Sequence, residues 1–122
     1  MSKKKILVVD DEPHLVRSLT FVLSKAGYDT SSASNGEEAL IKVREAKPDL
    51  MFLDVMMPKK NGYEVCQEIK NDPSLKDIYI IMLSAKGQEA DKDKGLSLGA
   101  DEFLSKPFSP VKIIERVKAL LG

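Results

Sequence analysis

The sequence ILVVDDEP, at residues 6–13, joins four consecutive apolar residues to three carboxylates and a proline. A short run that is apolar throughout is typical of a β-strand that is covered on both faces, as in a parallel sheet. Pro13 suits the first turn of a helix, and the apolar residues after it recur at helical spacing up to Gly27, which suits a helix end. The segment therefore predicts a strand over 6–9 followed by a helix over 13–26.

The same alternation of strand and helix continues along the chain. Further strands are predicted over 28–33, 50–53, 78–83 and 101–105, and further helices over 36–46, 63–70, 87–98 and 110–122. The strand over 28–33 is weakly apolar and is expected at or near a sheet edge, whereas the strongly apolar 78–83 is expected to be central. The pattern predicts an α/β fold, with a doubly wound parallel sheet and helices on both faces. The length of 122 residues fits a single domain over 1–122.

The composition excludes several kinds of chemistry. With one His and one Cys, the chain cannot supply a multi-histidine metal site, a zinc cluster, a CxxC pair or an internal disulfide. The 19 basic side chains balance 19 acidic ones, so no overall positive field favours direct binding of nucleic acid or an anionic membrane. No run approaches the roughly 18 apolar residues of a membrane span, and the first apolar run is too short for a secretory leader. We expect a cytoplasmic protein in which Cys66 is a reduced, unreactive thiol on a helix face.

Polar side chains follow four of the predicted strands. Asp10, Asp11 and Glu12 follow the first strand, Asp54 the third, Ser84 the fourth and Lys106 the fifth. In an open α/β sheet, ligands bind outside the carboxyl ends of the strands. These carboxylates, the hydroxyl and the ammonium are therefore expected to meet at one edge of the sheet.

The motifs at these strand ends resemble a known family. They read VVDDEP at 8–13, LDVMMP at 53–58, LSA at 83–85 and KPF at 106–108. In this order, over essentially the whole chain, they resemble the receiver domain of two-component response regulators. The resemblance implies the flavodoxin-like (CheY-like) fold, with five parallel strands in the order 2-1-3-4-5 and five helices.

With that strand order, the first and third strands are neighbours about 4.8 Å apart. Asp10, Asp11 and Asp54 would then crowd together, and their mutual repulsion would be relieved by a divalent cation. Oxygen ligands with open water positions suit Mg²⁺. Lys106 lies two strands from Asp54, a gap that its long side chain can largely close.

The resemblance assigns a role to each residue. Asp54 accepts the phosphoryl group. Mg²⁺ is held by Asp10, Asp11, Asp54 and the Met56 carbonyl. The phosphoryl oxygens are contacted by Lys106 and Ser84, and the switch is formed by Ser84 and Phe103. The family context also suggests a cis bond at Lys106–Pro107. Taken singly, the aspartates, Ser84 and Lys106 are more often ordinary residues of a helix start, a cap or a surface turn, so only their combination supports the assignment. Lys86 and Met56 flank the site and are expected to tune dephosphorylation.

The resemblance implies a signalling phosphoacceptor that catalyses its own phosphorylation and dephosphorylation rather than a conventional enzyme. The donor is a histidine kinase or a histidine phosphotransfer protein. The response is expected on the face formed by the segments 87–98, 101–105 and 110–122, where a downstream effector binds or a homodimer forms. No direct contact with nucleic acid or a membrane is expected.

Three alternatives share parts of this pattern. A flavodoxin-like protein would need a hydroxyl- and glycine-rich phosphate loop for FMN after the first strand, where this chain has Asp10–Glu12. A haloacid-dehalogenase-like phosphatase would need a DxD motif there, but Glu12 stands two residues after Asp10. A receiver used only for docking, without phosphorylation, would not need the complete set of site residues.

Overall fold

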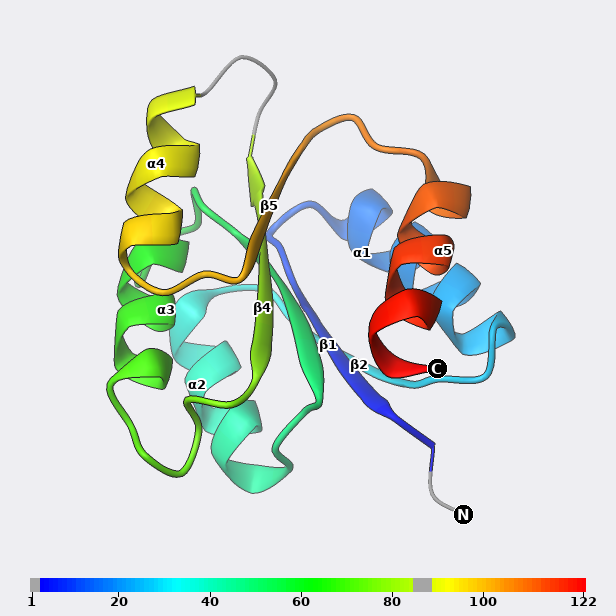
Figure 1. Ribbon diagram of the computed structural model, residues 1–122, viewed down its shortest axis with the longest axis horizontal. Coiled ribbons are helices and arrows are strands. Elements are labelled where there is room, and N and C mark those ends of the chain that lie inside the picture. Colours follow the sequence, from blue (N-terminus) through cyan, green and yellow to red (C-terminus); the bar gives the residue numbers. More distant parts are fainter. Residues whose placement is uncertain (1–2, 85–88) are drawn as a thin grey trace.

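The computed structural model describes residues 3–84 and 89–122. In chain order the elements are β1 (Lys5–Val9), α1 (Pro13–Lys25), β2 (Asp29–Ala33), α2 (Gly36–Glu45), β3 (Leu50–Asp54), α3 (Gly62–Lys70), β4 (Tyr79–Ser84), α4 (Glu89–Ser97), β5 (Glu102–Ser105) and α5 (Pro110–Leu121). The strands form one parallel sheet in the order β2-β1-β3-β4-β5 (Figure 1). The predicted fold and strand order are therefore confirmed.

Helices cover both faces of the sheet, with α1 and α5 on one side and α2, α3 and α4 on the other (Figure 1). Alternate residues of each central strand enter opposite layers of the core. In β1, Leu7 and Val9 pack towards α2 and α3, whereas Ile6 and Val8 pack towards α1 and α5. The strands β3 and β4 divide in the same way. This two-sided burial is the reason that the central strands are apolar at every position.

The strand β2 lies at one edge of the sheet, as its weaker apolar pattern predicts. Side chains from α2 bind its backbone there. Lys42 donates from Nζ to the Ser32 carbonyl, and the Ser34 N–H donates to Glu38 Oε1. These bonds satisfy backbone groups that an edge strand otherwise leaves to solvent or to another strand. The helix α2 therefore covers one face of the sheet and also binds its edge.

The helix ends follow local rules. Pro13 occupies the first position of α1, and Gly27 takes a φ of +102° just beyond its end, a conformation that glycine adopts without steric cost. The predicted helix over 63–70 begins one residue earlier in the structure, because Gly62 is the first residue of α3 and Asn61 is its N-cap. Asn61 and Glu64 form a complete capping box, in which each side chain accepts from the other residue's backbone N–H. That motif was present in the sequence.

The helix α4 occupies most of the predicted segment 87–98. The expected start of this helix, Lys86 and the last residue of the LSA motif fall within 85–88, outside the described residues. Gly95 faces the Met82 thioether of β4, so a small residue lets the helix lie close to the sheet. No helix within residues 3–84 and 89–122 combines the length and the apolar character that crossing a bilayer requires.

Cys66 is fully buried on α3, and burial raises the pKa of its thiol to about 11. Its Sγ donates to the Leu98 carbonyl at 3.8 Å. Because the thiolate is the reactive form, Cys66 in the folded protein is expected to react with a thiol reagent at pH 8 about two orders of magnitude more slowly than in the urea-unfolded chain. Absorbance-monitored labelling measures both rates, and equal rates would contradict this prediction.

Candidate functional site

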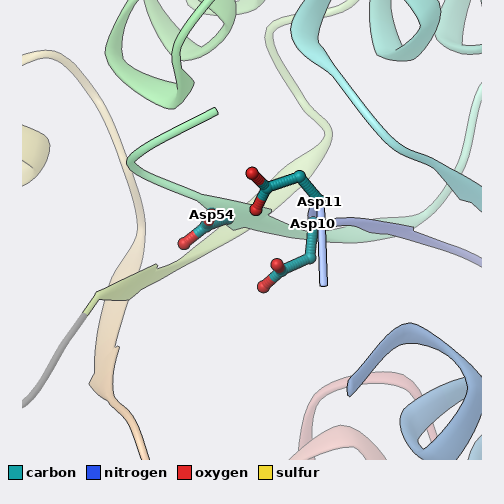
Figure 2. A group of neighbouring side chains, drawn as sticks. All are labelled: Asp10, Asp11 and Asp54. Carbon is teal, nitrogen blue, oxygen red and sulfur yellow. The ribbon is translucent and has the colours of Figure 1, made fainter. Parts of the chain in front are cut away.

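Three aspartates meet where β1 and β3 end. The two strands are neighbours, with Val9 opposite Leu53, so the following residues Asp10 and Asp54 lie side by side. One carboxylate oxygen from each of Asp10, Asp11 and Asp54 lies within 4.8 Å of the others. Asp10 and Asp54 are 1% and 6% exposed, whereas Asp11 is exposed. Figure 2 shows the three side chains gathered beyond the ends of these strands, as the sequence predicts.

Lys106 enters this cluster from the connection between β5 and α5. Its Nζ lies 2.8 Å from Asp10 Oδ2, 2.9 Å from Glu12 Oε2 and 3.3 Å from Asp54 Oδ1. The Lys106 backbone N–H donates to the Ser84 carbonyl, and the Lys106–Pro107 bond is cis, as expected. The prediction that the long side chain of Lys106 reaches Asp54 is therefore confirmed.

The pKa values of Asp54 and Lys106 are both raised, which disfavours the charged form of Asp54 and favours the charged form of Lys106. Burial, reinforced by the negative charge of Asp10, raises the pKa of Asp54 to about 6. Desolvation opposes the charged form of Lys106, but its contacts with Asp10 and Glu12 and the charge of Asp54 outweigh it and raise the Lys106 pKa. Lys106 is therefore a permanent cation in a pocket where negative charge remains in surplus.

The donor set fits Mg²⁺. Among the described residues, the fully buried Asp10 Oδ2 has no partner of hydrogen-bond geometry, although Lys106 Nζ stands 2.8 Å away. Carboxylate oxygens with spare acceptor capacity, next to an open cavity of about 1000 Å³ that admits water, are what this hard cation requires. Zinc would favour nitrogen or sulfur ligands, which the cluster does not contain within the described residues.

Most of the other predicted site residues line the same cavity. It is bordered by Asp11, Asp54, Met56, Ser84 and Lys106. Ser84 is 2% exposed at the end of β4, next to β3 in the sheet. The Met56 side chain is 74% exposed, which is consistent with a prediction that concerns only its carbonyl. Phe103 lies apart from this edge, inside β5, half-buried against the core layer that contains α2 and α3.

Two residues at the site had no predicted role. Glu12 reaches Lys106, and its backbone N–H donates to Asp10 Oδ1 at 3.0 Å. A Cβ on Gly62 would stand 2.2 Å from the Asp54 carbonyl oxygen, so α3 begins in direct backbone contact with the end of β3. The position of Glu12 among the acidic residues after the first strand was a usable signal, whereas no local pattern marks Gly62.

The doubly wound sheet, with carboxylates and a lysine at its carboxyl edge, defines the CheY-like class of flavodoxin-like folds. The family model described as the response regulator receiver domain matches residues 6–118. The chain therefore belongs to the response regulator receiver domain family. Members of this family take part in two-component signalling and bind Mg²⁺ in an acidic pocket, and response regulators receive phosphate from histidine kinases. This membership removes the flavodoxin and phosphatase alternatives.

Individual proteins agree with the family assignment. The chain is 52% identical to the alkaline phosphatase synthesis transcriptional regulatory protein PhoP of Bacillus subtilis over 118 residues. This alignment covers 97% of this chain and 48% of PhoP. The chain thus spans about half the length of this relative. A crystal structure of a response regulator from Chloroflexus aurantiacus superposes with a TM-score of 0.92 at 37% identity, covering 98% of both chains. A chemotaxis response regulator of Vibrio cholerae superposes with a TM-score of 0.90 at 31% identity, covering 98% of this chain and all of the other.

Proposed function

We propose that residues 1–122 form one receiver domain that transfers a phosphoryl group from a histidine kinase or a histidine phosphotransfer protein to Asp54. The observation that carries this proposal is the convergence of Asp54 with two further aspartates and Lys106 at the carboxyl edge of the sheet. The domain acts in the cytoplasm and catalyses its own phosphorylation and dephosphorylation. It does not turn over a separate substrate.

Asp10, Asp11, Asp54 and the Met56 carbonyl would hold Mg²⁺. When bound, the ion supplies positive charge that neutralises and orients the phosphoryl oxygens. An Asp54 oxygen attacks the phosphorus, the phosphorus–nitrogen bond to the donor histidine breaks, and the departing imidazole takes up a proton. Lys106 pairs with one phosphoryl oxygen, and the Ser84 hydroxyl donates to another. Positioning and charge neutralisation supply most of the catalysis in such transfers.

The cavity is larger than a phosphoryl group requires, and this supports a protein donor. From Asp54 it extends past Leu15 and Leu19 of α1 and past Phe108 and Pro110, which precede and begin α5. Of these residues, Leu15, Phe108 and Pro110 are at least partly exposed, and they give a partner protein an apolar surface beside the acceptor carboxylate. A histidine carried on a partner helix could then reach Asp54 while its neighbours pack against α1.

The response passes through Ser84 and Phe103 to the α4–β5–α5 face. Acyl phosphate adds roughly one negative charge at Asp54, which attracts the Ser84 hydroxyl, and Phe103 turns in behind it. Phe103 is half-buried, so an inward rotation has apolar surface to cover. The altered face then binds a downstream effector or a second copy of the domain.

The direct test is phosphorylation by a small-molecule phosphodonor. With an acyl phosphate or a phosphoramidate and Mg²⁺, the chain is expected to gain one phosphate, measured by intact mass spectrometry. With EDTA in place of Mg²⁺, incorporation is expected to fall to background, because the surplus negative charge around Asp54 then repels the anionic donor. Labelling that persists without a divalent ion, or that exceeds one phosphate per chain, would contradict the proposed function.

A further inference from the structure

Carboxylates surround the ammonium group of Lys106 within the described residues. An ammonium group has three protons, and Lys106 Nζ has three carboxylate neighbours, Asp10, Glu12 and Asp54, at 2.8, 2.9 and 3.3 Å. Of the three, the contact with Glu12 has hydrogen-bond geometry, whereas those with Asp10 and Asp54 are ion pairs. A phosphoryl oxygen that approaches Lys106 competes with these carboxylates for its charge. Which contact is released depends on what each carboxylate would lose.

The three carboxylates differ sharply in exposure. The side chains of Asp10 and Asp54 are 0% and 8% exposed, whereas that of Glu12 is 61% exposed. Water cannot replace the partner of a buried charge, whereas it readily solvates a carboxylate that leaves an exposed ion pair. Glu12 is therefore the contact that an incoming phosphoryl oxygen displaces.

The backbone fixes Glu12 in this position. Glu12 stands at the N-cap of α1, directly before Pro13, yet its side chain makes no capping bond. Its N–H is held by Asp10 Oδ1 at 3.0 Å. Its carboxylate instead reaches Lys106, which is 94 positions away in the sequence. Glu12 thus bridges the β1–α1 and β5–α5 connections at the mouth of the site.

We propose that Glu12 is a positioning residue that holds Lys106 in the unphosphorylated protein and competes with the phosphoryl group for it. This inference rests on the proposed function. Glu12 thereby weakens phosphoryl binding at rest and is released to solvent when Asp54 is modified. Because the Glu12–Lys106 pair is exposed on one side, its effect depends on ionic strength.

The test measures binding of beryllofluoride, a phosphoryl analogue, to the full chain in the presence of Mg²⁺ by isothermal titration calorimetry. Glu12→Gln keeps the size of the side chain but removes its charge. It is expected to tighten beryllofluoride binding about three- to fivefold at low salt, the range that an exposed ion pair supports. The gain is expected to shrink towards none at about 1 M salt, where the Debye length is about 3 Å.

Two further variants separate competition for Lys106 from a general charge effect. Glu12→Asp keeps the charge but shortens the side chain, so it loses the contact with Lys106 and is expected to resemble Glu12→Gln. Glu115→Gln removes an exposed carboxylate on α5, away from the cavity, and is expected to bind as the unmodified chain does.

Each alternative result overturns the inference in a distinguishable way. If Glu12→Gln binds with unchanged affinity, or with a gain that salt does not reduce, Glu12 does not compete for Lys106. If Glu12→Asp behaves as the unmodified chain, or Glu115→Gln gives the same gain, the effect is one of net charge. If the unmodified chain does not bind beryllofluoride with Mg²⁺ at all, the proposed function fails as well.

Discussion

Replacing Asp54 with Asn is expected to reduce phosphate incorporation from one per chain to none. The amide of Asn lacks the anionic oxygen that attacks phosphorus, while its size and shape are nearly those of Asp. The variant is expected to fold, because the change removes a carboxylate that burial and Asp10 both disfavour in its ionised form. Intact mass spectrometry measures the loss of labelling, and thermal unfolding confirms the folded state.

A matched control makes the same chemical change at the other end of β3. Asp49 stands directly before this strand, where its Oδ2 accepts from the Lys5 N–H at 2.8 Å, on the sheet edge opposite the site. Asp49→Asn is expected to be phosphorylated as the unmodified chain is. Equal labelling of the Asp54→Asn variant would remove Asp54 as the acceptor, and labelling lost from both variants would indicate a structural effect.

Replacing Gly62 with Ala is expected to lower the free energy of unfolding by about 2–4 kcal/mol, the upper range for overpacking. The new Cβ would stand 2.2 Å from the Asp54 carbonyl oxygen and 3.0 Å from the Val55 Cα. These are backbone atoms, so no side-chain rotation relieves the overlap. Either α3 or the end of β3 must move, and Asp54 moves with it. Urea unfolding measures the stability, and phosphorylation of the folded fraction is expected to fall too.

Gly95→Ala is the control for this prediction. There the new Cβ would approach the Met82 Sδ to 2.6 Å, and a thioether on a flexible side chain can move aside. Alanine also stabilises a helix by about 0.5–1 kcal/mol relative to glycine. The free energy of unfolding is therefore expected to change by no more than about 1 kcal/mol. Similar losses of stability in the two variants would show that the backbone contact at Gly62 is not special.

The architecture was predictable because burial on both faces leaves a direct trace in the sequence. In β3, each residue from Leu50 to Leu53 must be apolar, since neighbouring side chains enter different core layers. Asp54, at the end of this run, is therefore recognisable as a residue at the sheet edge. The strand order came from the family resemblance, because local patterns do not encode which strands are neighbours.

The parts of the site that escaped prediction depend on three-dimensional approach rather than on local pattern. The contact between Glu12 and Lys106 requires two connections far apart in the sequence to come within reach of two long side chains. The need for glycine at position 62 arises only because the start of α3 touches the backbone of Asp54. By contrast, the Asn61–Glu64 capping box is a local motif that the sequence shows directly, and it places the start of α3 one residue before the predicted 63–70.

The bonds from α2 to β2 limit how two copies of this chain can associate. An extra strand added at β2 would have to displace Lys42 from the Ser32 carbonyl and Glu38 from the Ser34 N–H before it gained its own hydrogen bonds. Among the residues that the structure describes, the strand at the other edge of the sheet is β5. Extending the sheet into a second molecule at β2 therefore costs two existing side-chain bonds, which disfavours that edge for self-association.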